Sequence, residues 1–121
     1  MARSDPVLEI PSEHFEQREF VKHFRKKYND IRIFAIPNGG KRGKAEAMRL
    51  KLEGVDPGVP DLFVPEWMLF IEMKRVKKGY LSKEQKEYKA YLEDCSYTVL
   101  VCKGCDDAIK KVEGFLSDKN S

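Results

Sequence analysis

The sequence has few cysteines, few histidines and no long apolar run. Three of its 121 residues are cysteine and two are histidine. Three cysteines are too few for a disulfide framework, so we expect free thiols and an intracellular protein of the cytoplasm or nucleoid. The longest apolar stretches, 67–71 and 97–102, are far shorter than the roughly 20 residues that span a bilayer. The first residues lack the apolar core of a signal peptide, so we expect no membrane association and no secretion.

The composition is that of a folded protein, with 41% hydrophobic and 36% charged residues. A length of 121 residues is typical of one domain. We therefore expect a single domain over 1–121, with an N-terminal arm at 1–11 and a polar tail at 117–121. The net charge of +3 identifies no partner by itself, because clustered lysines and arginines serve equally as solvated helix faces or as phosphate-binding surfaces.

The first predicted helix begins after Ser12, a capping residue, and runs to about Tyr28. Phe20, Phe24 and Tyr28 recur at intervals of four, which predicts one buried stripe. Glu16 lies four residues before Phe20 and therefore extends this stripe.

The rest of the chain alternates between strand and helix patterns. Ser82 and Gln85 form a capping-box pattern that opens a helix to about residue 92. The other expected helices are 44–53 and 108–116, and the expected strands are 31–36, 59–64, 68–75 and 97–102. These elements predict an α/β fold with a mixed four-stranded sheet flanked by helices.

Two of these strands carry ionisable residues near a hairpin turn. Asp61 lies before the turn, and Glu72 and Lys74 lie after it. A turn centred between Glu66 and Trp67, if it carries no bulge, sets Asp61 opposite Glu72. Lys74 then shares a face with Glu72, because side chains alternate along a strand.

Two chemical interpretations of these groups are open. One is an ion pair of Lys74 with Asp61 or Glu72 on a solvated sheet face. The other is a divalent cation held by both carboxylates, with water and a substrate phosphate completing its coordination. In that case Lys74 would orient the attacking water or stabilise developing negative charge.

The residues Pro60-Asp61 and Glu72-Met73-Lys74 match the PD-(D/E)XK nuclease signature in order and spacing. The surrounding sequence resembles the virus-type replication-repair nuclease (VRR-NUC) domain, with matching segments at 37–40, 54–62, 70–74 and 81–85. This resemblance covers nearly the whole chain. It implies a restriction-endonuclease-like fold and a metal-dependent endodeoxyribonuclease.

The resemblance implies roles for the residues of the signature. Asp61 and Glu72 would bind Mg²⁺ or Mn²⁺, and the backbone carbonyl of Met73 would complete the protein ligands. Lys74 would assist the attacking water. Gln85 matches a glutamine that approaches the site in this family, with a purely capping role as the alternative. No organic cofactor is expected.

The family also places a glutamate of the first helix beside the metal. We favour Glu16, because it continues the apolar stripe toward the sheet, and Glu13, one turn earlier, is the competing residue. Residues expected to contact DNA lie in two stretches rich in basic residues: Asn38, Gly39, Gly40, Lys41, Arg42 and Lys44 in one, and Arg75, Lys77 and Lys78 in the other.

The substrate preference is a looser prediction, because a fold does not fix a substrate. Symmetric cleavage of branched DNA needs two active sites, so the first choice is a homodimer acting on four-way (Holliday) junctions or related branches, as in DNA repair. A monomeric flap or nicking nuclease is the second choice. A non-catalytic nucleic-acid-binding protein with the same fold is the contrasting class.

Two other features receive structural interpretations. Cys102 and Cys105 have the spacing of a zinc or redox motif, but no second pair accompanies them, so we expect incidental thiols. Trp67 in the hairpin turn is expected to pack rather than to stack on a base.

Overall fold

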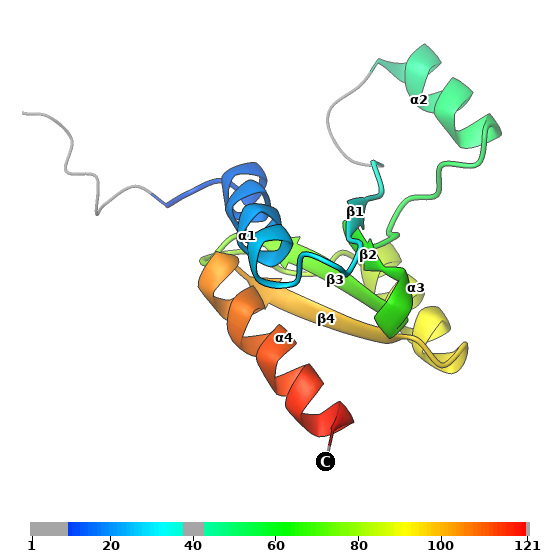
Figure 1. Ribbon diagram of the computed structural model, residues 1–121. Helices are drawn as coiled ribbons and strands as arrows, with labels where there is room; N and C mark the ends of the chain where they lie inside the picture. Colours follow the sequence, from blue (N-terminus) through cyan, green and yellow to red (C-terminus); the bar gives the residue numbers. More distant parts are fainter. Residues whose placement is uncertain (1–9, 38–42, 121) are drawn as a thin grey trace, which may run out of the picture.

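A mixed four-stranded sheet organises the chain, as predicted (Figure 1). The computed structural model describes residues 10–37 and 43–120. Strands lie in the order β1-β2-β3-β4, with β1 and β2 antiparallel, β2 and β3 antiparallel, and β3 and β4 parallel. In chain order the elements are α1 (Glu13–Lys27), β1 (Phe34–Ala35), α2 (Lys44–Leu52), β2 (Leu62–Val64), the 3₁₀ turn η2 (Pro65–Trp67), β3 (Leu69–Lys74), α3 (Lys83–Asp94), β4 (Thr98–Lys103) and α4 (Cys105–Lys119).

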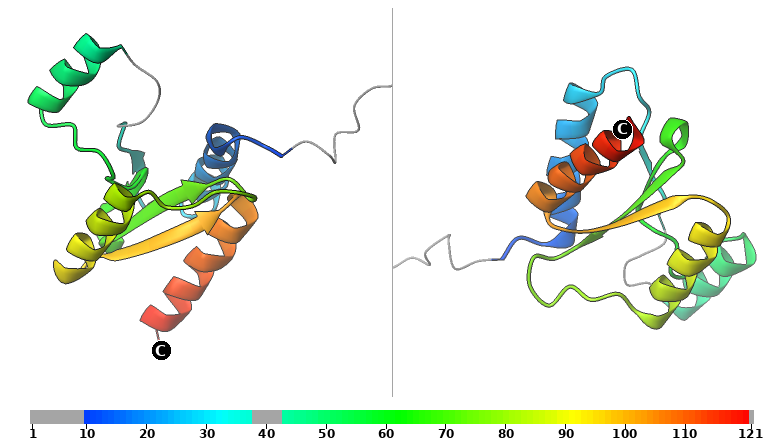
Figure 2. Two further views of the ribbon diagram at one scale, coloured as in Figure 1. Left: turned by 180° about the vertical axis from the view of Figure 1, so that it is seen from behind. Right: turned by 90° about the horizontal axis from the view of Figure 1, so that it is seen from below.

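Helices cover both faces of the sheet. Helices α1 and α4 lie side by side on one face, and α3 lies on the other (Figures 1 and 2). Helix α2 stands apart from the sheet in all three views, and none of its residues is buried. Among the described residues, no helix is long and apolar enough to cross a membrane.

The hydrophobic core fills the space between the sheet and the α1/α4 pair. Phe20 and Phe24 are almost fully buried, as their helical spacing predicts, and their rings meet edge to face with centroids 6.0 Å apart. Trp67 packs against Phe24, Tyr28 and Phe115, which confirms its packing role. Other core side chains come from the strands and α4: Leu62, Val64, Leu69, Ile71, Met73, Cys102, Ala108 and Val112.

Both predicted helix starts are confirmed. The Ser12 side chain accepts a hydrogen bond from the Phe15 N–H at 3.0 Å, and Ser82 forms a complete capping box with Gln85. Each serine satisfies a backbone donor that the first turn of a helix leaves without a partner. Cys95, Cys102 and Cys105 are all free thiols, as expected.

The first strand is shorter than the predicted 31–36. The turn after α1 extends to Ile31, whose N–H donates to the Tyr28 carbonyl at 3.0 Å. The Ile33 carbonyl accepts from Arg25 Nη2 at 3.2 Å, so a side chain occupies an acceptor that a longer strand would use. Strand pairing is therefore limited to Phe34 and Ala35.

The last helix is longer than the predicted 108–116. It begins at Cys105, directly after Gly104, whose φ of 93° ends the strand sharply. It continues to Lys119, so residues 117–119 of the expected tail are helical. Polar residues of this last turn fit a helix because they stay on its exposed side.

Candidate active site

The hairpin brings Asp61 and Glu72 together in the predicted register. Leu62 pairs with Ile71 across β2 and β3, so the preceding residue, Asp61, lies opposite Glu72. Two backbone bonds fix Asp61 in place: its carbonyl accepts from Ile36 N at 2.8 Å, and its Oδ2 accepts from Met73 N at 2.8 Å. The carboxylate of Asp61 is therefore tied to the strand that carries Glu72.

Glu72 is buried on the face of the sheet that α3 covers. As whole residues, Glu72 is 3% exposed and Lys74 is 7% exposed. Gln85 Nε2 donates to Glu72 Oε2 at 3.1 Å, and Lys74 Nζ lies 3.8 Å from the same oxygen. The structure thus brings together the four polar residues Asp61, Glu72, Lys74 and Gln85.

The two carboxyl groups cannot both ionise easily without a cation. Burial, followed by repulsion from and hydrogen bonding to Asp61, raises the pKa of Glu72 to about 9, and the charge of Lys74 only partly offsets this. Glu72 is therefore protonated at neutral pH in the metal-free protein. Such a pair is poised to exchange its proton for a cation.

Gln85 performs two tasks with one side chain. Its Oε1 accepts from the N–H of Ser82 at 2.8 Å, which closes the capping box, while its Nε2 donates to Glu72. The capping bond and the contact with Glu72 are therefore compatible in one side chain. The first turn of α3 orients a hydrogen-bond donor toward the Glu72 carboxylate on β3.

The segment before Asp61 is pressed against the same turn of α3. Gly58 has a φ of 93°, and a Cβ at this position would lie 2.5 Å from the Glu84 carbonyl oxygen. Tyr88 Oη donates to Asp56 Oδ2 at 3.1 Å. These contacts hold the segment that precedes Asp61 against α3, the helix that carries Gln85.

The two glutamates of α1 have different surroundings. Glu16 is 8% exposed, as its place on the apolar stripe predicts, but its Oε1 accepts from the Cys105 N–H at 2.8 Å. It therefore caps the first turn of α4. Glu13 is exposed, and its charge makes the smallest of the contributions that raise the pKa of Glu72.

The residues predicted to contact DNA are only partly described. Asn38, Gly39, Gly40, Lys41 and Arg42 lie outside the described residues. Lys44, Arg75, Lys77 and Lys78 are exposed, and the last three follow directly on the end of β3. Arg75 Nη2 also donates to the Ile10 carbonyl at 3.3 Å.

Two residues that the sequence did not single out lie at this end of the sheet. Lys103 pairs in register with Lys74 across β3 and β4, and its Nζ lies 5.2 Å from the centroid of the Tyr80 ring. The parallel pairing of β3 with β4 brings Lys103 beside Lys74. No local sequence signal indicates it.

Cys102 and Cys105 flank the turn between β4 and α4. Cys102 is fully buried among core side chains, and burial raises the pKa of its thiol to about 12. Burial also raises the pKa of the Cys105 thiol. Both thiols are therefore protonated and weakly nucleophilic at neutral pH.

No protein-family model matches the sequence, and no curated protein matches it. Among solved structures, the chain is similar to a VRR_NUC domain protein with 24% sequence identity and a TM-score of 0.73. The similarity covers 90% of this chain and 91% of that one. The chain therefore has the fold of a VRR-NUC domain, and the fold class expected from the sequence is confirmed.

Proposed function

We propose that this chain is a metal-dependent nuclease that hydrolyses phosphodiester bonds of DNA at the Asp61 and Glu72 pair. The observation that carries the proposal is the pair of facing carboxyl groups, Asp61 half-buried and Glu72 buried, with the ammonium of Lys74 3.8 Å from Glu72. A purely structural ion pair between Lys74 and Glu72 would not require Asp61, a second carboxyl group that raises the pKa of Glu72. The similarity to a VRR_NUC domain protein supports the same assignment.

The side chains fit a hard divalent cation. Within 10–37 and 43–120 no group of three or more histidine, cysteine, aspartate or glutamate side chains is arranged to hold a metal. Two carboxylates and the backbone carbonyl of Met73 nevertheless form an all-oxygen set of the kind Mg²⁺ and Mn²⁺ accept, with water and substrate oxygens as further ligands. A bound cation would polarise the phosphate and make a nearby water more acidic.

The neighbouring side chains have separate tasks in this proposal. Lys74 holds a positive charge 3.8 Å from Glu72, where it can orient the attacking water and stabilise negative charge in the transition state. Gln85 fixes the orientation of the Glu72 carboxylate through its 3.1 Å hydrogen bond. Both groups are held by packed elements, so little reorganisation is needed before reaction.

For the α1 carboxylate we propose Glu13 as the site residue and Glu16 as a positioning residue. The Glu16 carboxylate is already engaged with the α4 backbone, and a charged group at a helix N-terminus is stabilised there. Glu13 is exposed and interacts electrostatically with Glu72. This assignment reverses the preference drawn from the apolar stripe.

We further propose that branched DNA is the substrate and that two copies of the chain act together on four-way junctions. The exposed basic residues Lys44, Arg75, Lys77 and Lys78 suit contacts with phosphates, which position DNA without reading its sequence. The monomeric flap nuclease and the non-catalytic binding protein are the outcomes against which this proposal is tested.

The decisive experiment is cleavage of a labelled panel of single-stranded, duplex, flap, splayed-arm and four-way DNA in Mg²⁺ or Mn²⁺. Wild type is compared with Glu72→Gln and with Glu66→Gln, a matched change at an exposed glutamate of the same hairpin. We expect cutting by wild type and Glu66→Gln, and loss of cutting in Glu72→Gln and in chelator.

The pattern of cutting distinguishes the alternatives. Paired symmetric incisions in the four-way substrate, with a dimer in sedimentation, support the junction proposal. Single incisions in the flap by a monomer support the flap nuclease. Tight DNA binding without cutting by any variant supports the non-catalytic class, and equal cutting by wild type and Glu72→Gln contradicts the assigned site.

A further inference from the structure

An exposed aromatic ring lies beside the proposed active site. Tyr80 is 75% exposed, which is unusual for a large aromatic side chain, and the ammonium of Lys103 lies over one face of its ring at 5.2 Å from the centroid. This cation–π contact orients the ring while the rest of its surface remains open to solvent.

The position of Tyr80 is fixed by the residue before it. Gly79 is buried, and a Cβ at this position would lie 2.5 Å from the Arg75 carbonyl oxygen and 2.9 Å from the Cβ of Lys74. The 75–79 turn is therefore folded back onto the end of β3. Tyr80 begins the return of the chain immediately beside the strand that carries Glu72 and Lys74.

The β4 strand places Lys103 on the same side. Lys103 pairs with Lys74 in the parallel register, and in-register side chains of neighbouring parallel strands point to the same face. Glu72, Lys74 and Lys103 therefore share one face, and Tyr80 is connected to it through Lys103. Exposed Arg75, Lys77 and Lys78 add positive charge to the intervening turn.

We propose that Tyr80 and Lys103 form a stacking platform for an unpaired nucleotide next to the scissile phosphate. The open area of the Tyr80 ring would stack on the base, and Lys103 would pair with a phosphate of the same strand. Exposed aromatic rings flanked by cations bind single-stranded nucleic acid in this way, because every base has a stacking face. This inference rests on the proposed nuclease function, and it adds the feature of the substrate that the site recognises.

The platform predicts a preference for DNA with unpaired nucleotides over paired duplex, which positive charge alone would not produce. In a fully paired duplex the bases are stacked on one another, so Tyr80 gains no base contact. At a flap or overhang an unpaired base is available, whereas a fully paired four-way junction offers one only where a base pair at its branch point opens. Substrates with an unpaired nucleotide beside the cleavage position should therefore bind more tightly than the duplex.

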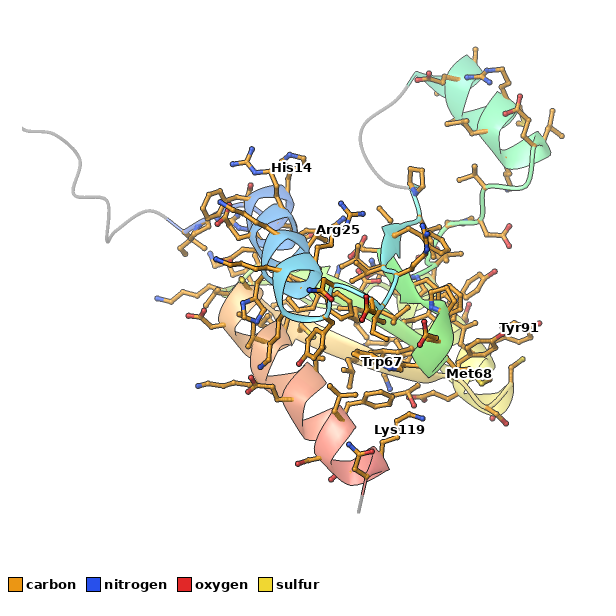
Figure 3. The ribbon with its side chains drawn as sticks, viewed as in Figure 1. His14, Arg25, Trp67, Met68, Tyr91 and Lys119 are labelled. Atoms are coloured by element: carbon orange, nitrogen blue, oxygen red, sulfur yellow. The ribbon has the colours of Figure 1, made fainter. Side chains whose placement is uncertain are left out.

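The test measures stacking directly, without cleavage. A DNA with a single-stranded overhang carries 2-aminopurine at each of the first few unpaired positions in turn, and binding is followed by fluorescence with Ca²⁺ in place of Mg²⁺. The full chain is compared with Tyr80→Ala, Tyr80→Phe and Tyr91→Ala. Tyr91 is a matched control, since it is 61% exposed and lies at the far end of α3 (Figure 3).

We expect wild type, Tyr80→Phe and Tyr91→Ala to quench the fluorescence at one position, and Tyr80→Ala to lose the quench and to bind the overhang DNA about tenfold more weakly. Affinity for the paired duplex should be unchanged in all of them. A quench that persists in Tyr80→Ala, an equal loss of affinity for the duplex, or no DNA binding by wild type overturns the proposal.

The two proposals fail separately in this design. Quenching that depends on Tyr80, in a protein that cuts no DNA in Mg²⁺, keeps the platform and refutes the nuclease. Metal-dependent cutting without such quenching refutes the platform and keeps the nuclease. A thermal melt of Tyr80→Ala that matches wild type confirms that the variant is folded.

Discussion

The backbone N–H of Cys105 donates to Glu16 Oε1 at 2.8 Å, joining two residues that are 89 positions apart in the sequence. The preceding residue, Gly104, donates its N–H to the Lys74 carbonyl at 3.0 Å. Glu16 is thus connected through the start of α4 to the end of the strand that carries Lys74. The role proposed for Glu16 is therefore to position the end of β3, and it differs from the role proposed for Glu13 one turn earlier.

Removing the Glu16 carboxylate should destabilise the protein. Glu16→Ala leaves the part-buried Cys105 N–H without its acceptor, so we expect the free energy of unfolding to fall by about 1–3 kcal/mol in urea titrations. Glu13→Ala, at an exposed position, should change it by less than about 0.5 kcal/mol. Glu13→Ala should instead weaken Mn²⁺ binding and cleavage. If Glu16→Ala weakens Mn²⁺ binding and cleavage while Glu13→Ala does not, Glu16 is the site residue.

The stability of the metal-free protein should fall as the pH rises. Burial and Asp61 raise the pKa of Glu72 from 4.5 to about 9, so between these values only the folded state holds the proton. The free energy of unfolding then falls by at most about 1.4 kcal/mol per pH unit for this group, and levels off above the folded-state pKa. Melting temperatures in chelator from pH 5 to about 9.5 measure this. Glu72→Gln should flatten the profile.

Divalent cations should reverse this loss. A cation held by Asp61 and Glu72 binds the folded state only, so Mn²⁺ at about 100 times its dissociation constant should add about 2.7 kcal/mol. Binding displaces the proton of Glu72, so the affinity should increase with pH between about 6 and 9. Thermal shift and calorimetry test both points. Asp61→Asn should abolish the shift, and an undiminished shift in that variant would place the cation elsewhere.

Gln85 can be tested for its two roles separately. Gln85→Glu keeps an acceptor for the Ser82 N–H, so the start of α3 should remain intact, but it places a third carboxyl against Glu72. We expect near-normal helix content, and cleavage reduced by at least about tenfold as a result of the lost donor to Glu72. Gln85→Ala should lose activity and also destabilise the helix by about 1 kcal/mol. Equal activity of wild type and Gln85→Glu would leave only the capping role.

Two glycines with left-handed backbones provide a matched pair. Gly54 has a φ of 106° with open space around its Cα, whereas Gly58 has a φ of 93° and faces the Glu84 carbonyl. Gly54→Ala should cost about 1–2 kcal/mol from backbone strain alone. Gly58→Ala should cost clearly more and should also reduce cleavage, because it pushes the segment before Asp61 away from α3. Equal costs in chemical denaturation would contradict this role for Gly58.

Local sequence patterns predicted much of the candidate site. The hairpin register that sets Asp61 opposite Glu72 follows from the turn position alone, and the Leu62 to Ile71 pairing confirms it. The capping box at Ser82 likewise depends on residues three positions apart, and it brings Gln85 to Glu72 as the resemblance implied. These features were predictable because each depends on few neighbouring residues.

Features that depend on distant contacts were not predictable in this way. Helical periodicity correctly placed Glu16 on the buried face, but it could not reveal that the α4 backbone lies there. The early start of α4 and the Lys103 to Tyr80 contact depend on the parallel pairing of β3 with β4. The short β1 depends on a side-chain bond from Arg25 to Ile33. Each results from tertiary packing, which a local pattern does not contain.

The parallel pairing of β3 with β4 also affects how the protein is made. The end of β3 has its complete set of backbone partners only after β4 and the start of α4 have been synthesised, because the Lys74 carbonyl binds Gly104. Pairings between distant segments also form late in folding. A ribosome-bound chain that ends before β4 thus lacks the support for Glu72 and Lys74, and the proposed activity would be delayed until the C-terminal part of the domain is translated.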